Sequence, residues 1–285
     1  MKLLAFSLRL RAGGGDGFAV GRQSFLGGML HGAWEDQIHQ YAPQLREILG
    51  LVSGTSGQQA APKRYAMLPP PWAQPLSILE DGSAHLGFGV VLYGAAADHA
   101  SELGAAFCHC PALRLGAQQD RIEHSEFGEH TPVNPDVFPA LAWIKLHWLT
   151  PLLLESAGQR KLGADVRPPA LLRVVRSIAR RIRELEPALA EQLGLYDADW
   201  IIAEESIRAL AAQSADWRTV SWRYGSRTKD VPVQFHGQLG CAGYFAANPG
   251  SIPANIHALL QWGTWFGVGQ RTALGQGFYR IEVAT

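Results

Sequence analysis

The chain has 285 residues, and one order of predicted elements occurs twice along it, which limits the folds that it can adopt. Near the N-terminus, apolar and polar residues alternate over 4–11, and this period of two predicts a half-buried strand. Apolar residues at helical spacing over 24–41 predict a helix. Further strands, a helix over 96–110 and a strand over 113–124 complete the first half. This half is therefore predicted to run strand, helix, strands, helix, strand.

The second half repeats that order. A strand is predicted over 142–156, a strongly amphipathic helix over 169–187 and another helix over 198–213. Paired strands, a helix over 255–266 and a closing strand over 277–283 follow. The small fold with this order of elements is the ferredoxin-like β-α-β-β-α-β unit.

We therefore predict an α+β protein made of two tandem ferredoxin-like domains. The first comprises residues 1–125 and the second residues 143–285, and the linker between them, 126–142, is rich in Pro and Asn. We expect the second domain to contain an arginine-rich helical insertion and a glycine-rich loop at 267–277.

Composition argues against several classes of protein. The formal net charge is zero, so only local clusters of charge can indicate a nucleic-acid partner. The three cysteines are odd in number and lack a Cys-x-x-Cys spacing, which argues against a disulfide scaffold and a structural zinc site. Arg9 and Arg11 interrupt the N-terminal apolar run, and no stretch approaches about 18 apolar residues. We expect a cytoplasmic protein with no signal peptide and no membrane partner.

The C-terminal loop "GVGQRTALGQG" is the most specific motif of the chain. It places two Gly-x-Gly pairs on either side of one arginine: Gly267, Gly269, Arg271, Gly275 and Gly277. A dinucleotide-binding loop would need glycine where Thr272 stands, and the Gly-Lys-Ser/Thr of a P-loop is absent from the sequence. Glycine lets backbone N–H groups approach an anion, and an arginine adds positive charge, so the loop favours phosphate contact. The alternative is a turn that only connects helix to strand.

This loop resembles the G-x-G, five residues with a basic one, G-x-G loop of CRISPR-associated repeat-RNA endoribonucleases of the RAMP superfamily. Other stretches resemble the same family in order along most of the chain: "FLGGMLHGAWEDQI", "FGVVLYGAAAD", "LTPLLL" and "WRYGSRTKDVPVQFHGQLGCAGYF". The loop is specific, and the other stretches are weak alone. The resemblance implies two tandem ferredoxin-like domains, the same order that the pattern of elements predicts.

Two basic clusters are candidates for RNA contact. In the helix over 169–187, three arginines at i, i+3 and i+7 form a stripe that suits the phosphates of an RNA hairpin. The arginines that we expect to contact RNA there are Arg173, Arg176, Arg180, Arg181 and Arg183. The alternative is a solvated face paired with the acidic residues of 184–205.

The second cluster combines basic and aromatic residues over 217–229, a composition that suits base stacking and phosphate contact. Its candidate RNA-binding residues are Arg223, Arg227 and Lys229. An ordinary exposed hairpin would explain the cluster equally well.

The family resemblance implies cleavage of RNA without metal or other cofactor. The ribose 2′-hydroxyl attacks the adjacent phosphorus and leaves 2′,3′-cyclic phosphate and 5′-hydroxyl ends, commonly with a histidine of the first domain near the glycine loop. A histidine suits proton transfer because it titrates near neutral pH, and an arginine suits the charge on phosphorus. The catalytic candidates are His31, His39, Arg22 and Tyr41.

Between the two histidines we prefer His31, at the edge of the apolar face, to His39, which lies further out. Glu35 is four residues from each and could orient either one. Tyr41 lies on the apolar side, which also suits a core residue. The family's helper beside the histidine is often a lysine or tyrosine, and this helix has no lysine.

The main hypothesis is a metal-independent endoribonuclease that cuts the hairpin of CRISPR repeat RNA to give mature crRNA and stays bound to its product. The alternative is a catalytically inert RAMP subunit that holds the guide RNA of an effector complex. A third hypothesis, a nucleotide-binding enzyme, is disfavoured because the loop lies beside the C-terminus. The expected partners are repeat RNA or crRNA and other effector-complex subunits, with no direct contact to DNA.

Overall fold

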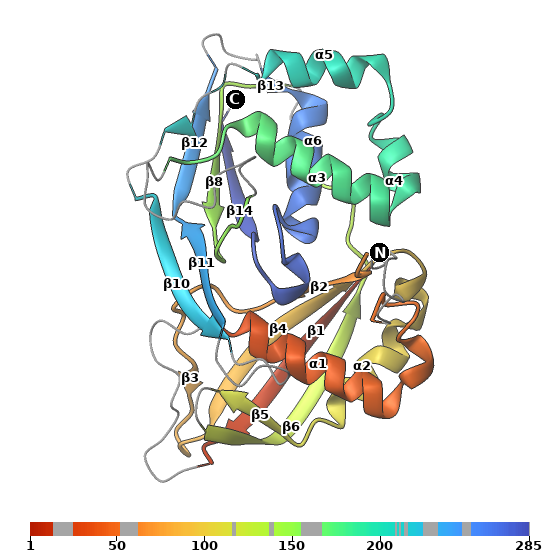
Figure 1. Cartoon of the computed structure of the whole chain (residues 1–285), viewed down its shortest axis with the longest axis vertical. Coiled ribbons are helices and arrows are strands. Elements are labelled where there is room, and N and C mark those ends of the chain that lie inside the picture. The colour runs from red at the N-terminus through yellow and green to blue at the C-terminus, as the bar shows by residue number, and fades with distance from the viewer. Residues whose placement is uncertain are drawn as a thin grey trace. The chain divides into compact units, whose positions relative to one another are not determined.

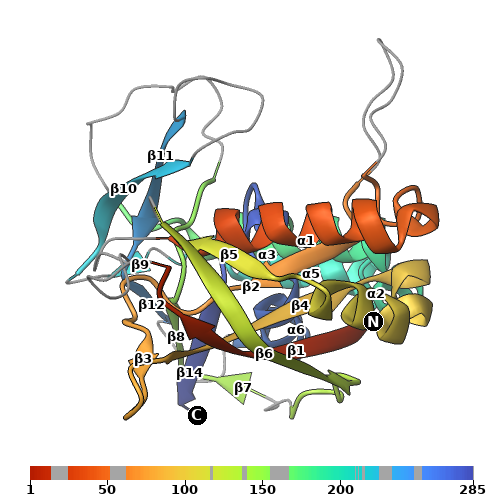
Figure 2. The same ribbon diagram turned by 90° about the horizontal axis from the view of Figure 1, so that it is seen from below.

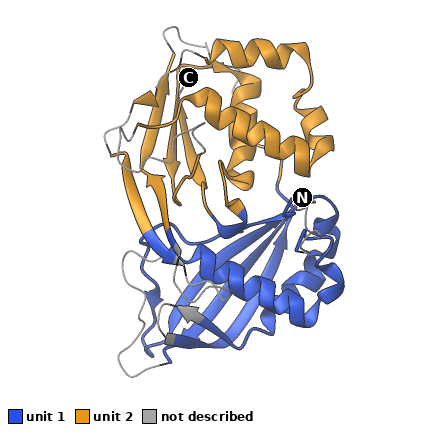
Figure 3. Ribbon diagram, in the orientation of Figure 1, with its two compact units in different colours: residues 1–132, 222–234, 273–275 blue, residues 133–221, 235–272, 276–285 orange. Residues whose placement is uncertain are grey.

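The computed structural model describes residues 1–13, 25–51, 62–115, 118–136, 140–154, 167–208, 210, 212–213, 216–224, 233–246 and 252–284. The fold is mixed α+β, and the chain forms two compact units (Figure 3). Unit 1 comprises Met1–Pro132, Trp222–Gln234 and Ala273–Gly275, and unit 2 comprises Val133–Ser221, Phe235–Thr272 and Gln276–Thr285. The first division falls within 126–142, where we expected the linker, and strand β6 occupies the beginning of that segment.

Unit 1 is built on an antiparallel sheet with the strand order β2-β4-β1-β6-β5. Figure 1 labels its elements, which are β1 (Lys2–Arg11), α1 (Gly27–Tyr41), β2 (Tyr65–Leu68), β3 (Ser77–Ile78), β4 (Ala84–Leu92), α2 (Ala100–Cys108), β5 (Ala112–Leu115) and β6 (Gln118–His130), with 3-10 turns at Pro43–Leu45 and Gly94–His99. Apart from the short β3 and β5, the order is the strand-helix-strand-strand-helix-strand that the sequence predicts for this half.

The core of unit 1 depends on the alternation along β1. Its even-numbered side chains, Leu4, Phe6, Leu8 and Leu10, are buried in one cluster with apolar residues of α1 and α2. The Phe6 ring stacks on Phe88 at 4.8 Å and meets Phe107 edge-on at 4.9 Å. Figure 2 shows α1 on one side of the sheet. The odd-numbered residues of β1 therefore lie on the face away from the helices.

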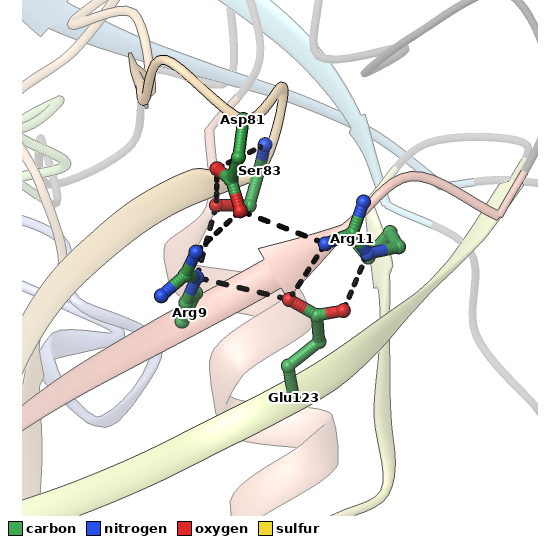
Figure 4. A network of polar contacts seen from close by, with 5 residues as sticks. All are labelled: Arg9, Arg11, Asp81, Ser83 and Glu123. Carbon is green, nitrogen blue, oxygen red and sulfur yellow. Dashed lines mark hydrogen bonds and ion pairs between the residues drawn. The ribbon is translucent and has the colours of Figure 1, made fainter.

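On that second face, a polar network connects the end of β1 with β6 and with the turn before β4 (Figure 4). Arg9 donates to Ser83 at 3.1 Å and pairs with Asp81, while Arg11 pairs with Glu123 of β6. Hydrogen bonds from Ser83 and Arg9 lower the pKa of Asp81 below its usual range. Because these side chains are half exposed, each pair adds little stability. The network instead neutralises both arginine charges on this face.

Unit 2 has a second antiparallel sheet, with the strand order β14-β8-β12-β9. Its strands and helices are β8 (Trp143–Trp148), α3 (Leu171–Leu185), α4 (Pro187–Gln192), α5 (Ala198–Ser206), β9 (Ala212–Gln213), β12 (Cys241–Phe245), α6 (Ala254–Phe266) and β14 (Tyr279–Ala284). A 3-10 turn at Thr272–Leu274 begins at the last residue of this stretch of unit 2 and continues in unit 1. Two small sheets pair β7 (Ala140–Leu141) with β13 (Ile252–Pro253), and β10 (Arg218–Tyr224) with β11 (Val233–Leu239). The main elements β8, α3, β9, β12, α6 and β14 repeat the order of unit 1.

Helix α3 packs its apolar face against α6, as Figure 1 shows. Val175, Ile178 and Ile182 are among its fully buried side chains. The helix that we predicted over 198–213 is wrong at its end, because α5 stops at Ser206 and residues 212–213 pair with β12 as β9. No helix within the described residues is long and apolar enough to cross a membrane.

Candidate functional site

Helix α1 carries the preferred catalytic candidate, His31, on the edge of its buried face. The imidazole is 6% exposed, and Glu35 lies one helical turn further along. The chain then returns through Lys63 and enters β2 at Tyr65, and both of these side chains reach His31. Two elements of unit 1 thus build one polar cluster: His31, Glu35, Lys63 and Tyr65.

The four side chains meet around one carboxylate oxygen. The His31 Nε2 atom lies 3.0 Å from Tyr65 Oη, 3.1 Å from Lys63 Nζ and 3.1 Å from Glu35 Oε1. The Tyr65 hydroxyl donates to the same Glu35 oxygen at 2.8 Å, and the Lys63 ammonium also donates to it. The other ring nitrogen, Nδ1, is buried without a hydrogen-bond partner among the described residues. Nε2 is therefore the nitrogen that can exchange a proton within this cluster.

Burial sets the charge states of the cluster. It lowers the pKa of His31, and although Glu35 acts in the opposite direction, desolvation is the larger effect. Burial opposes ionisation of Glu35, but its hydrogen bonds to His31 and Lys63 outweigh that effect and lower its pKa to about 2. Near pH 7 the cluster therefore combines a neutral imidazole with a carboxylate. A neutral imidazole can accept a proton.

The other first-domain candidates lie away from this cluster. His39 is exposed. The prediction that Tyr41 lies on the apolar side is wrong: it is 44% exposed and stacks on His109 at 4.5 Å, because it is the last residue of α1. Arg22 lies outside the described residues. Within the part of the chain that the structure describes, no group of three or more His, Cys, Asp or Glu residues is placed to bind a metal ion.

Sequence reasoning missed Lys63 and Tyr65. Neither is near His31 in sequence, and only the pairing of β2 with the sheet brings them beneath α1. Their spacing of two residues was a usable signal, because alternate residues of an extended segment lie on the same side. The spacing indicates that Lys63 and Tyr65 lie on the same side of the chain, but it does not indicate that this side faces His31.

Three glycines of the C-terminal loop allow close approaches of the backbone. Gly269 and Gly277 have φ values of 83° and 76°, and a Cβ atom at Gly277 would lie 1.9 Å from the Val268 carbonyl oxygen. The N–H groups of Gly267, Gly269 and Gly277 donate to Gly263 O, Ser177 Oγ and Pro151 O. In this conformation these three amides are engaged within the protein, so the phosphate contact that we predicted for the loop depends on its other groups.

The remaining loop candidates are Arg271 and Gly275. Arg271 has φ 58°, unusual for a residue other than glycine, and its guanidinium lies 4.1 Å from the centre of the Phe235 ring. Burial lowers the pKa of Arg271. Gly275 belongs to unit 1, where a Cβ atom would meet Pro69 Cδ at 2.6 Å. An arginine stacked on a ring keeps its N–H donors in the guanidinium plane, which leaves Arg271 suited to phosphate.

The arginines of α3 divide into two groups. Arg173, Arg176 and Arg180 lie on the exposed face, and Arg176 pairs with Glu204 of α5 at 2.8 Å. For Arg176 the structure thus contains the ion pair that the alternative hypothesis predicts. Arg181 donates to Phe266 O at 3.1 Å, and Arg183 donates to Leu195 O. These two arginines bond to backbone carbonyls within unit 2.

The second basic cluster is only partly described. Arg223 is exposed on β10, whereas Arg227 and Lys229 lie outside the described residues. Trp222 is 7% exposed, with its ring 5.3 Å from Phe25 and 5.8 Å from Trp72. Its aromatic face is therefore occupied by protein, so it is not open to an RNA base in this conformation.

Comparison with known proteins finds a family match in the second half of the chain. Residues 146–279 match the family model described as CRISPR-associated endoribonuclease Cas6. This match covers slightly less than half of the chain, and it shows that this stretch is similar to the Cas6 family. Among curated proteins, none matches the chain significantly.

Solved Cas6 structures are similar over nearly the whole chain. The product complex of Thermus thermophilus Cas6 shares 15% identity with a TM-score of 0.60 and covers 98% of this chain and 99% of that chain. A second Cas6 product complex shares 20% identity with a TM-score of 0.54 and covers 99% and 100%. The partial Cas6-RT-Cas1–Cas2 complex shares 11% identity with a TM-score of 0.54, covering 99% of this chain and 46% of that chain. At these identities the likeness shows a common fold.

We predict that Glu35→Gln lowers the pKa of His31 further, because the lost carboxylate is the group that raises it. The measurement is an NMR titration of the His31 ring, whose pKa should already lie below 6.5 in the wild type. The control is Glu47→Gln, at an exposed position of the same unit, which should leave the titration unchanged. A rise in the pKa of His31 on Glu35→Gln would contradict the electrostatic account.

We also predict that Gly277→Ala destabilises the protein more than Gly82→Ala. Both glycines have φ 76°, so both substitutions strain the backbone alike, but no atom of the described residues lies within 4 Å of the methyl group added at Gly82. The clash with Val268 O should lower the Tm of Gly277→Ala by roughly 5 °C more than that of the control. Equal Tm values, measured by circular dichroism, would show that the close approach is unimportant.

Proposed function

We propose that this chain is a Cas6 endoribonuclease that binds and cuts the hairpin of CRISPR repeat RNA without metal, and that its two units act as tandem ferredoxin-like, RAMP-type RNA-binding modules. The observation that carries the proposal is the polar cluster of unit 1, in which a neutral histidine meets a lysine, a tyrosine and a carboxylate. The family's activity needs a proton acceptor and positive charge at one phosphate, and the cluster supplies both groups.

In the proposed step, the ribose 2′-oxygen attacks the adjacent phosphorus and its proton passes to His31 Nε2. The bond from phosphorus to O5′ breaks, and Lys63 donates a proton to the departing O5′. The products are a 2′,3′-cyclic phosphate and a 5′-hydroxyl. The proton on His31 then returns to Lys63 across their 3.1 Å contact, which restores both groups. Positive charge beside the phosphate also stabilises the negative charge that develops on it.

Glu35 and Tyr65 position the two acting groups. The carboxylate accepts from both Lys63 and Tyr65, so it fixes the ammonium beside the imidazole. Because His31 is only 6% exposed, the scissile phosphate must approach from the Lys63 side of the cluster, where the lysine side chain is 37% exposed.

Binding of the hairpin would use the basic groups that remain on the surface. We assign the phosphates of the stem to the exposed arginines of α3, Arg173, Arg176 and Arg180, and to Arg271 of the glycine-rich loop. Two similar structures are described as Cas6 product complexes, which supports retention of the cleaved RNA. The Cas6-RT-Cas1–Cas2 complex supports partners among other CRISPR proteins.

We predict that His31→Ala slows single-turnover cleavage of repeat hairpin RNA by roughly 10²- to 10⁴-fold, the usual contribution of a general base. The control is His39→Ala, which removes the exposed histidine of the same helix and should stay within a few-fold of wild type. RNA binding should be retained in both variants. If the cleavage rate of His31→Ala stays within a few-fold of the wild-type rate, His31 is not the base. If the wild-type protein binds the RNA but does not cleave it, the result favours the inert RNA-holding subunit.

A further inference from the structure

A groove of about 460 Å³ opens on the sheet of unit 1, on the face away from its helices. β1 and β4 form its floor, and the proline-rich segment that follows β2 forms its wall. The floor and the wall both lie wholly within unit 1. Nothing in the proposed cleavage step uses this groove.

The floor is flat because its side chains are small. Ala5 lies opposite Gly89, and Ser7 lies opposite Gly87, so two adjacent rows of the sheet carry almost no side-chain atoms. A Cβ atom at Gly87 would meet no atom closer than 3.7 Å, so the space above it is open. The wall contains the prolines Pro69, Pro70, Pro71 and Pro75. A flat floor beside proline rings fits a planar ring.

The described lining of the groove also carries a few hydrogen-bonding groups. His85, Ser77 and Gln74 are its polar side chains, and the ring of His85 is fixed by a 3.0 Å hydrogen bond between its Nε2 atom and Ser7 Oγ. Among the residues that the structure describes, none that lines the groove is Asp, Glu, Lys or Arg. Mostly apolar pockets with a few polar groups favour neutral, partly polar rings. A nucleobase has that chemistry, whereas a phosphate does not.

The groove adjoins the segments that we assign to the RNA substrate. β2 carries Tyr65 of the catalytic cluster at its first residue and leads into Pro69 of the wall, about 13 Å further at roughly 3.3 Å per residue. Pro69 also touches Gly275 of the glycine-rich loop. The cluster and the groove lie on opposite faces of the sheet, so an RNA strand that occupied both would pass around β2, which is the edge strand.

We propose that this groove binds one unpaired base of the RNA substrate, outside the hairpin stem. The inference rests on the proposed endoribonuclease function and adds a binding site for a single-stranded segment. The base lies above Gly87, where the floor is open, and His85 meets its edge, while Leu3 and Leu68 close the floor at Gly89. Such a site makes recognition depend on the unpaired nucleotides beside the hairpin as well as on the stem, because RNA-binding proteins read splayed single-stranded bases most readily.

The test fills the groove without disturbing the fold. Gly87→Val places a side chain in the open space above the floor, and the control Gly128→Val adds the same side chain on the same sheet face outside the groove, where its Cβ meets only His130 at 3.4 Å. Both full-length variants should melt close to wild type. Their affinities are measured for repeat RNA with its unpaired flanks and for the hairpin alone.

Gly87→Val should weaken binding of the flanked RNA roughly tenfold and leave hairpin-only binding unchanged. In an abasic scan, each unpaired nucleotide of the flanks is replaced in turn by a nucleotide without a base. One such replacement should weaken binding to the wild-type protein as much as Gly87→Val does. The same replacement should not weaken binding to the Gly87→Val variant any further. Equal affinities of Gly87→Val and Gly128→Val for flanked RNA would overturn the groove proposal, as would an equal loss on hairpin-only RNA. Wild-type protein that neither binds nor cuts either RNA would overturn the proposed function as well.

Discussion

The alternation of apolar and polar residues along β1 determines the arrangement of unit 1. Its even-numbered side chains bury the core beneath α1 and α2, and this packing fixes α1 with His31 at the edge of the buried face. Its odd-numbered positions form the opposite face, where Ala5 and Ser7 leave room for the groove and where Arg9 and Arg11 are neutralised by acids. One strand therefore positions the catalytic candidate on one face and the proposed base site on the other. A shift of one residue in its register would exchange the two faces.

The second constraint is electrostatic. A buried imidazole stays neutral more readily than an exposed one, and a buried carboxylate is tolerated only when it is hydrogen-bonded. Here Glu35 accepts from Lys63 and Tyr65, and burial lowers the pKa of His31 although Glu35 acts in the opposite direction. The cluster thus keeps a proton acceptor and a proton donor 3.1 Å apart near neutral pH. That combination suits a reaction in which one proton leaves a hydroxyl and another reaches a leaving oxygen.

Much of this architecture could be predicted from local pattern. The alternation over 4–11, the helical spacing over 24–41 and the repeated order of elements predicted the two α+β units, and the glycine-rich loop indicated the family. Contacts distant in sequence were beyond such reasoning. Lys63 joins His31 only through strand pairing, and Arg181 and Arg183 face backbone carbonyls that a helical wheel cannot show. The glycines of the loop were predicted to contact phosphate, whereas the amides of Gly267, Gly269 and Gly277 bond within the protein.

The most direct test of the account is cleavage by the wild-type protein in EDTA. The substrates are an end-labelled hairpin from the host's CRISPR repeat and a copy with a single 2′-deoxy nucleotide at the scissile position. The account predicts that only the all-ribose RNA is cut and that its 5′ fragment ends in a 2′,3′-cyclic phosphate. Cleavage of the deoxy copy, or cleavage that requires added metal, would contradict attack by the 2′-hydroxyl.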